Sequence, residues 1–73
     1  MVLDKVSWII AEILNIARGD LDVNRDLILY GLDSARAMDL IIELEEHFRV
    51  EIPDEVIAGL RTASDIARTL EGL

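Results

Sequence analysis

Apolar residues recur every three or four positions in two long stretches of the chain, and this spacing predicts amphipathic helices. The first helix is expected from about Leu3 to Arg18 because Gly19, a common left-handed helix end, follows a basic residue there. Its apolar face consists of Val6, Ile9, Ile10, Ile13 and Ala17. Trp8 lies off the centre of this face, so we interpret it as edge packing rather than as a ligand-binding residue.

The second helix is expected from about Ser34 to Phe48, with a core-facing stripe that Met38 and Ile42 flank. That stripe consists of Leu40, Ile41, Leu44 and Phe48. Three acids recur on another face without a basic partner between them, namely Asp39, Glu43 and Glu46. Each pair of like charges at this spacing lowers the stability of the helix by roughly a few tenths of a kcal/mol. This loss of stability indicates a face that is kept for a partner protein.

The connection of residues 19–33 between these helices is long but rich in apolar residues. Seven of them are expected to pin it to the bundle: Leu21, Val23, Leu27, Ile28, Leu29, Tyr30 and Leu32. Asp26 could cap a short helical turn over Leu27–Tyr30. We interpret Tyr30 as a packing residue, and the connection as the segment that holds Ser34 in place.

The remaining residues predict two further helices. Pro53 excludes Ile52 from a helix and can open a short one over about Asp54–Gly59. Thr62 or Ser64 then caps a last helix over about Ala63–Leu70, whose inward residues are Ile66, Ala67 and Leu70. The sequence therefore predicts an all-α fold, a small four-helix bundle of three main helices and one short helix. Without repeats or linkers, residues 1–73 are expected to form one domain and a monomer.

Composition and charge narrow the function. The chain has 73 residues and no cysteine, so it has neither a disulfide framework nor a thiolate metal site. Its apolar content of 52% is interrupted by charges, and its start does not resemble a signal peptide, so we expect a cytoplasmic protein without a membrane partner. Because the chain starts at a methionine and ends three residues after Leu70, we also expect a free-standing protein rather than an excised domain. The net charge is −8, of which residues 33–55 contribute −6. This acidity argues against nucleic acid and favours basic docking surfaces on partner enzymes.

Ser34 is the one candidate for covalent chemistry. Asp33 is a good N-cap, which puts Ser34 at the first helical position, where free N–H groups and the helix dipole suit a phosphate ester. The only histidine, His47, lies 13 residues later, about 20 Å along the same helix. A hydrolytic nucleophile needs a base within hydrogen-bond reach, so Ser34 is interpreted as a site that another enzyme modifies.

Catalysis and metal binding by the chain itself are not expected. The acids lie along an exposed helix instead of converging in a cleft that would shift their pKa values. One histidine and no calcium-loop pattern argue against a metal site. Glu43 and His47 are four residues apart and are expected to form a surface pair.

The sequence around Ser34 resembles the attachment region of carrier proteins that bear phosphopantetheine. The resemblance rests on Leu27-Ile28, on Tyr30-Gly31-Leu32-Asp33-Ser34, and on Arg36 and Met38. Downstream, Leu44-Glu45-Glu46 with Phe48 and Glu51-Ile52-Pro53-Asp54-Glu55 resembles acyl carrier proteins. The attachment motif itself is closest to aryl carrier domains of nonribosomal peptide synthetases.

This resemblance implies a carrier without catalytic activity. A phosphopantetheinyl transferase would move the arm from coenzyme A to Ser34, normally with magnesium, and Asp33, Leu32 and Arg36 would adjoin the arm. Further partners would be an adenylating or other loading enzyme and condensing, ketosynthase or tailoring enzymes. The docking residues on this reading are Ala35, Met38, Asp39, Ile42, Glu45 and Glu46.

Two residues depart from the pattern of many acyl carriers. Ala35 replaces a leucine, which removes part of an apolar contact for a partner. Arg36 replaces an acid or neutral residue, and a cation near a helix start opposes the dipole slightly. Arg36 could offset this by pairing with the phosphate of the arm, with Asp33, or with Asp39.

The cargo stays open between several classes. The pattern of Tyr30, Arg36 and Met38 favours an aryl or aminoacyl group, and the segment Ile52–Glu55 with the acidity favours polyketide or fatty-acyl traffic. We expect a carrier of a nonribosomal peptide or polyketide pathway, with a D-alanyl or fatty-acid carrier as alternatives. The alternative that is not a carrier protein is an unmodified acidic protein-interaction module. Val6, Ile41 and Ile57 are candidates for lining an internal cavity, although tight packing is the default.

Overall fold

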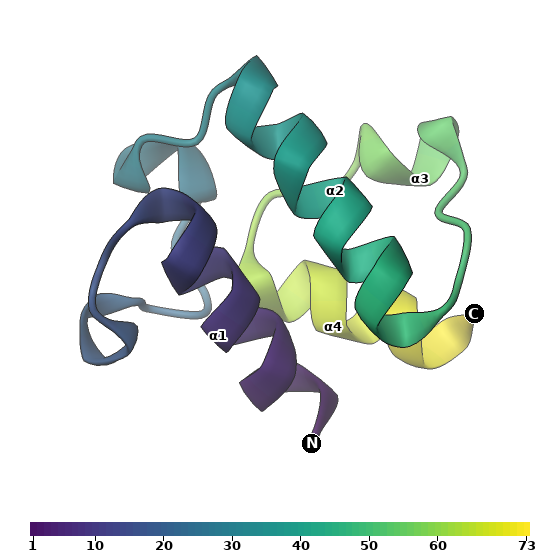
Figure 1. The fold of residues 1–73 in the computed structure, drawn as a ribbon, viewed down its shortest axis with the longest axis horizontal. Coiled ribbons are helices and arrows are strands. Elements are labelled where there is room, and N and C mark those ends of the chain that lie inside the picture. The colour runs from purple at the N-terminus through teal and green to yellow at the C-terminus, as the bar shows by residue number, and fades with distance from the viewer.

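The computed structural model describes all 73 residues, and every regular element in it is helical, which confirms the predicted fold class (Figure 1). The elements are α1 (Val2–Leu14), η1 (Arg18–Asp20), η2 (Leu27–Tyr30), α2 (Ser34–Phe48), α3 (Asp54–Ile57) and α4 (Ala63–Gly72), where η denotes a short 3₁₀ turn. Helices α1, α2 and α4 surround one apolar core, and α3 is a single turn beside them. The start of α2 lies at the end of the molecule opposite the N-terminus (Figure 1).

Helix α1 ends four residues before the predicted Arg18. It ends at Leu14 because Asn15 takes the left-handed conformation, with φ of 56°, and its N–H donates to carbonyls of the last turn. Asparagine tolerates this conformation better than most residues do. Gly19 therefore lies in η1 and does not end the helix, and Ala17 is exposed rather than part of the apolar face.

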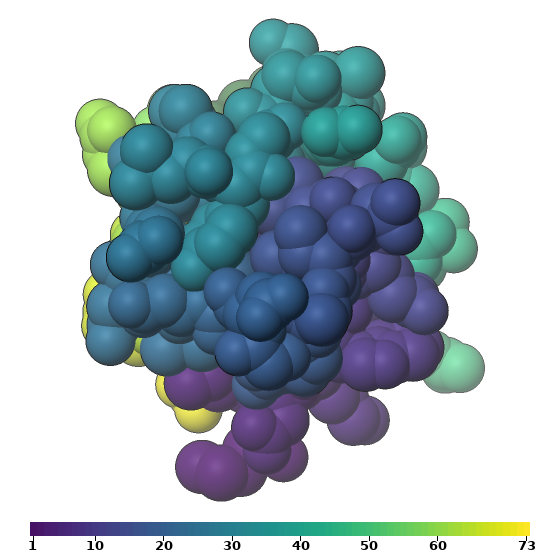
Figure 2. Space-filling view, turned by 90° about the vertical axis from the view of Figure 1, so that its left-hand side faces the viewer, coloured from purple at the N-terminus to yellow at the C-terminus, as the bar shows by residue number.

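The connection to α2 contains the predicted helical turn, η2. The Asp26 carboxylate accepts the Ile28 N–H at 3.0 Å, as a cap does. Backbone bonds tie the connection to the start of α4 and to the residue just before its cap: Ser64 N–H donates to Val23 O at 3.0 Å, and Leu27 N–H donates to Arg61 O at 2.9 Å. In Figure 2, this connection, coloured blue to teal, covers much of the face turned toward the viewer.

The apolar residues of the connection divide into two groups. Leu21 and Leu27 are buried, and the side chain of Tyr30 packs against the core while its hydroxyl accepts the Asp22 N–H at 2.7 Å. Tyr30 is thus a packing residue, as predicted. The prediction was wrong for Ile28 and Leu29, because these two side chains are 66% and 72% exposed. A 3₁₀ turn buries only part of its circumference, and Leu27 occupies the inward side.

Helix α2 has both of its predicted ends. The Asp33 carboxylate caps its start, and Arg49, with φ of 53°, ends it in the left-handed conformation. Leu40 and Leu44 are buried, whereas Ile41 and Phe48 are partly buried against the core. The stripe thus faces inward as predicted.

The last two helices begin where predicted and end differently. Helix α3 ends at Ile57, two residues before the predicted Gly59, and α4 extends two residues past Leu70 to Gly72. Thr62, rather than Ser64, caps α4: its hydroxyl accepts the Asp65 N–H at 3.1 Å, and the Asp65 carboxylate accepts the Thr62 N–H at 3.2 Å. Such a reciprocal capping box satisfies two otherwise free N–H groups.

Asp65 carries the one clear pKa shift of the chain. Partial burial raises the pKa of its carboxyl, but N–H bonds from Arg61 and Thr62, the Thr62 hydroxyl and the nearby Arg68 together hold that pKa below its ordinary value of 3.8. The guanidinium of Arg68 lies 2.6 Å from Asp65 in the only ion pair of the structure. The first turn of α4 is therefore fixed by several hydrogen bonds and one ion pair to Asp65.

Two side chains of α1 are unusual. Ser7 is fully buried, and its hydroxyl has no hydrogen-bond partner in the protein. Trp8 is 52% exposed, in keeping with its place off the centre of the apolar face. None of the helices has the length and apolar character that crossing a bilayer requires.

Candidate functional site

Ser34 is the first residue of α2 and is exposed. Its hydroxyl takes part in no hydrogen bond within the chain, and neither do the N–H groups of Ser34 and Ala35. These free N–H groups belong to the positive end of the helix dipole. Ser34 thus presents an unbonded hydroxyl at a helix start that favours a phosphate.

Asp33 fixes the register of this helix start. Its carboxylate accepts the Arg36 N–H at 2.9 Å, and its carbonyl accepts the Ala37 N–H at 2.8 Å. Before it, Gly31 closes η2 with φ of 96°, a conformation that favours glycine. The chain therefore turns sharply between η2 and α2, and Ser34 lies at the corner.

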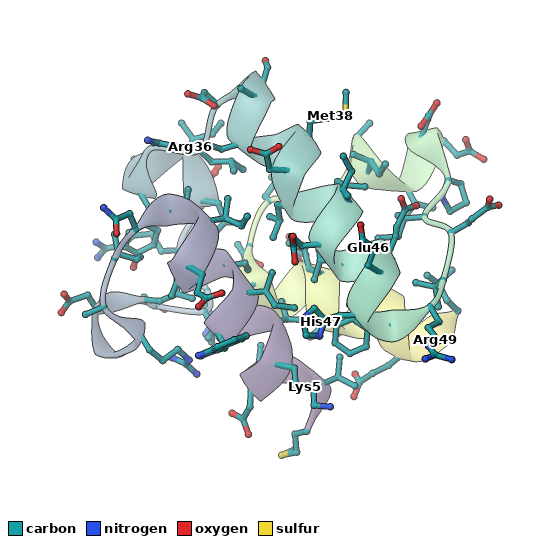
Figure 3. The ribbon with its side chains drawn as sticks, viewed as in Figure 1. Lys5, Arg36, Met38, Glu46, His47 and Arg49 are labelled. Carbon is teal, nitrogen blue, oxygen red and sulfur yellow. The ribbon has the colours of Figure 1, made fainter.

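Arg36 does not form the ion pair with Asp33 or Asp39 that the sequence allowed, because the only ion pair of the structure joins Arg68 and Asp65. Its Nη1 instead donates to the Gly31 carbonyl at 3.2 Å. Figure 3 shows Arg36 reaching from the start of α2 toward η2, while Met38 extends away from that side. The side chains of Arg36 and Met38 therefore point to different sides of the start of α2.

Ser34 lies between two surface hollows. The hollow on the η2 side, of about 390 Å³, is lined by Ile28, Leu32, Asp33, Ser34 and Ala37. The hollow on the α3 side, of about 360 Å³, is lined by Ser34, Ala37, Met38, Ile41, Asp54, Ile57 and Ala58. Most of the lining of the second hollow is apolar, so it suits an apolar group near Ser34.

A smaller cavity of about 50 Å³ lies deeper and is lined only by apolar side chains. It shares Ala37, Ile41 and Ile57 with the hollow on the α3 side. Ile41 and Ile57 thus line a cavity as suggested by the sequence, but Val6 does not, because it is fully buried elsewhere in the core. Two of the lining residues were not singled out from the sequence, namely Ala37 and Ala58. The three-residue spacing of Ser34 and Ala37 could have indicated the first, whereas the second depends on how α3 packs.

The predicted docking residues of α2 differ in their surroundings. Five of them are exposed: Ala35, Met38, Asp39, Ile42 and Glu46. The sixth, Glu45, is half-buried, and its Oε2 accepts the Ile52 N–H at 2.8 Å.

The expected pair of Glu43 and His47 is not formed, since no ion pair joins them. Both side chains stay exposed, because water competes well with such a surface pair.

Comparison with known proteins places this chain in a family. Residues 4–70 match the model of the family described as "Phosphopantetheine attachment site". The chain is also 36% identical to an acyl carrier protein of Prochlorococcus marinus, over an alignment that covers 96% of this chain and 89% of that protein. The chain therefore belongs to the phosphopantetheine-binding carrier protein family, and its cofactor is a covalently attached phosphopantetheine group.

The residues around Ser34 fit this group. An exposed hydroxyl is available for the phosphate ester, and two unbonded N–H groups adjoin it. The Asp33 carboxylate beside it is engaged as a helix cap, since one of its oxygens accepts the Arg36 N–H. Members of this family interact with a phosphopantetheinyl transferase and with enzymes that handle acyl groups.

Proposed function

We propose that Ser34 bears the phosphopantetheine arm and that the chain holds a cargo on it for successive enzymes of a nonribosomal peptide or polyketide pathway in the cytoplasm. The observation that carries this proposal is the free hydroxyl of Ser34 at the start of α2. Of the three serines, only Ser34 combines exposure with an unbonded hydroxyl. Asp33, Leu32 and Arg36 adjoin the arm in this proposal.

The arm supplies a terminal thiol, which can hold the cargo as a thioester and which a chain without cysteine lacks. The protein contributes no catalytic group, and its role is tethering. A tethered substrate has a high effective concentration at each enzyme that the carrier reaches. Weak docking suits this role, because the carrier must also dissociate.

The hollow on the α3 side of Ser34 favours a short apolar cargo, such as an aryl group. Its lining by Met38, Ile41 and Ile57 can cover one apolar face of such a group. The cavity behind it, about 50 Å³, is well below the 150 Å³ or so that a benzene-binding cavity offers. We therefore place the cargo in the hollow rather than inside the bundle.

A fatty-acyl cargo is the second candidate. The relative from Prochlorococcus marinus is named an acyl carrier protein, and the similarity extends over nearly the whole chain. Loading the arm with a panel of aryl acids, amino acids and fatty acids, each with its activating enzyme, separates the candidates. Preferential loading of fatty-acyl groups would reject the aryl assignment.

We further propose that partners dock on α2 beside Ser34. Met38 is 65% exposed, and the neighbouring Ile42 and the acids Asp39 and Glu46 are exposed as well. Charge would steer a basic partner, and the apolar contacts would hold it. Ala35 provides little apolar contact. Glu45 keeps one carboxylate oxygen for a partner, since the other holds Ile52.

Intact mass tests the attachment directly. The purified chain, incubated with coenzyme A, magnesium and a transferase of broad specificity, is expected to gain about 340 Da, the mass of the arm. Ser34→Ala is expected to gain nothing, while Ser64→Ala gains the full mass. If the wild-type chain gained no mass, or if Ser34→Ala gained it equally, the attachment site would be wrong and an unmodified interaction module would become the better account.

A further inference from the structure

Arg36 occupies an unusual place for a cation. It lies in the first turn of α2, where the positive end of the helix dipole disfavours a basic side chain. The Asp33 and Asp39 carboxylates do not pair with it, and its guanidinium instead donates to the Gly31 carbonyl at 3.2 Å. A cation placed against the dipole, with a backbone carbonyl as its side chain's partner in the chain, indicates that this bond has a role.

The acceptor of this bond has no other donor within the chain. The N–H of Gly31 donates to Ile28 O at 3.0 Å, which closes η2, but no backbone N–H reaches the Gly31 carbonyl. The left-handed conformation of Gly31, with φ of 96° and ψ of 15°, directs the chain away from η2 at this point. The guanidinium of Arg36 therefore supplies the bond that links this turn to α2.

Arg36 makes hydrogen bonds to both chain neighbours of Leu32, namely Gly31 and Asp33. Its backbone N–H donates to the Asp33 carboxylate at 2.9 Å, and its side chain reaches back to Gly31. These two bonds close a loop of chain from residue 31 to residue 36, and Ser34 lies inside it. Figure 3 shows this course of Arg36, across the turn and toward η2.

We propose that Arg36 is a positioning residue that holds the turn before α2, so that the Ser34 hydroxyl keeps one direction for the transferase. This inference rests on the proposed attachment at Ser34. It differs from a role of Arg36 in binding the phosphate of the arm, because the bond to Gly31 is present before any arm is attached. A fixed hydroxyl matters because a small misplacement of a reacting group slows a reaction strongly.

The test compares Arg36→Met, which keeps an unbranched side chain without a donor, with Arg36→Lys, which keeps a cationic donor. Arg49→Met is the matched control, since it removes the same charge from the other end of α2, where the side chain makes no hydrogen bond. Hydrogen exchange of the Gly31 and Leu32 amides, whose N–H groups donate to Ile28 O and Leu27 O, is measured in the unmodified protein. Attachment kinetics are then measured with coenzyme A and the transferase, and circular dichroism verifies that each variant is folded.

For Arg36→Met, we expect exchange at Gly31 and Leu32 to quicken about fivefold and attachment to slow about fivefold, the change that one exposed hydrogen bond to a charged donor supports. The loss should appear in kcat rather than KM, and Arg36→Lys should restore most of it. Arg49→Met should leave both measurements unchanged. Unchanged exchange in Arg36→Met would overturn the proposal, as would a rate loss confined to KM that high salt removes, since that is a charge effect.

Failure of the proposed function is distinguishable from failure of this inference. If the wild-type chain gained no mass, the attachment at Ser34 would be rejected. If the wild-type chain gained mass while the turn of Arg36→Met exchanged like that of the wild type, the attachment would stand and the positioning role would be rejected.

Discussion

Ser34 and Ser64 lie in the first turns of two helices, yet their surroundings differ completely. Ser64 is half-buried, its hydroxyl donates to the Asn24 side chain at 2.9 Å, and its N–H donates to Val23 O. Ser34 is exposed, and neither its hydroxyl nor its N–H has a partner in the chain. Of the two helix starts, only that of α2 leaves the polar groups of its serine exposed and unbonded.

The caps of the two helices show the same contrast. Helix α4 has a reciprocal capping box, and the connection of residues 19–33 covers its start. Helix α2 has a single side-chain cap from Asp33, and two hollows flank its first residue. The start of α4 is thus bonded within the fold, whereas the start of α2 is left open to solvent.

The largest effect is expected from moving the hydroxyl. In the double variant Ser34→Ala, Ala35→Ser, the hydroxyl is rotated about 100° around the helix and leaves the corner between the hollows. Intact mass after incubation with transferase and coenzyme A should then show no detectable gain. A full gain would mean that any serine at this helix start suffices, and the contrast with Ser64 would lose its meaning.

A side chain at Gly31 should distort the turn before Ser34. With φ of 96°, Gly31→Ala is expected to lose about 1–2 kcal/mol of unfolding free energy, because the left-handed region strains residues with a Cβ. Gly19→Ala is the control: nothing lies within 4 Å of its added Cβ, so its stability should change by less than about 0.5 kcal/mol. Urea unfolding followed by circular dichroism measures both. If Gly31→Ala and Gly19→Ala had equal unfolding free energies, the turn at Gly31 would accommodate a side chain without strain.

Removing the two caps separates stability from access. Asp33→Ala and Thr62→Ala should each lose about 1 kcal/mol of unfolding free energy, the usual worth of such a cap. Asp33→Ala should also slow attachment, because the cap fixes the first turn that bears Ser34. Thr62→Ala should be modified at the wild-type rate. A comparable slowing in Thr62→Ala would assign the effect to general instability.

The smallest effect is the pH dependence that Asp65 confers. Because the fold lowers the pKa of Asp65 below 3.8, its ionised form stabilises the protein above that value, and this contribution disappears as the pH falls through the lowered pKa. Thermal unfolding between pH 7 and pH 2 should therefore decline less steeply in Asp65→Asn than in the wild type at the acid end. Parallel curves would place the acid sensitivity elsewhere.

The sequence predicts α2 at both ends because strong signals agree there. Asp33 is a good cap, the apolar stripe is regular, and Pro53 excludes a continuation. The end of α1 was mistaken because its apolar spacing continues to Ala17 and Gly19 is the more common terminator, whereas Asn15 ends the helix in the structure. Asn15 and Gly19 could each end the helix, and the tertiary packing of the residues that follow determines which of them does.

The site was predictable as a position but not as a shape. Gly31, Asp33 and Ser34 lie within four consecutive residues, so their motif identifies the helix start and its exposed hydroxyl. The hollows depend on where η2 and α3 lie, and these are set by tertiary contacts. Likewise, the sequence offers Arg36 several acceptors, and only the left-handed turn at Gly31 brings that carbonyl within its reach.

The half-exposed indole of Trp8 has a practical consequence. It is the only tryptophan, it lies on α1, and it lines neither hollow beside Ser34. Its fluorescence emission should thus follow the loss of the folded core yet stay constant while the arm is attached or loaded. The chain carries its own optical reporter of integrity, which allows damage to the fold and changes at Ser34 to be recorded separately in one cuvette.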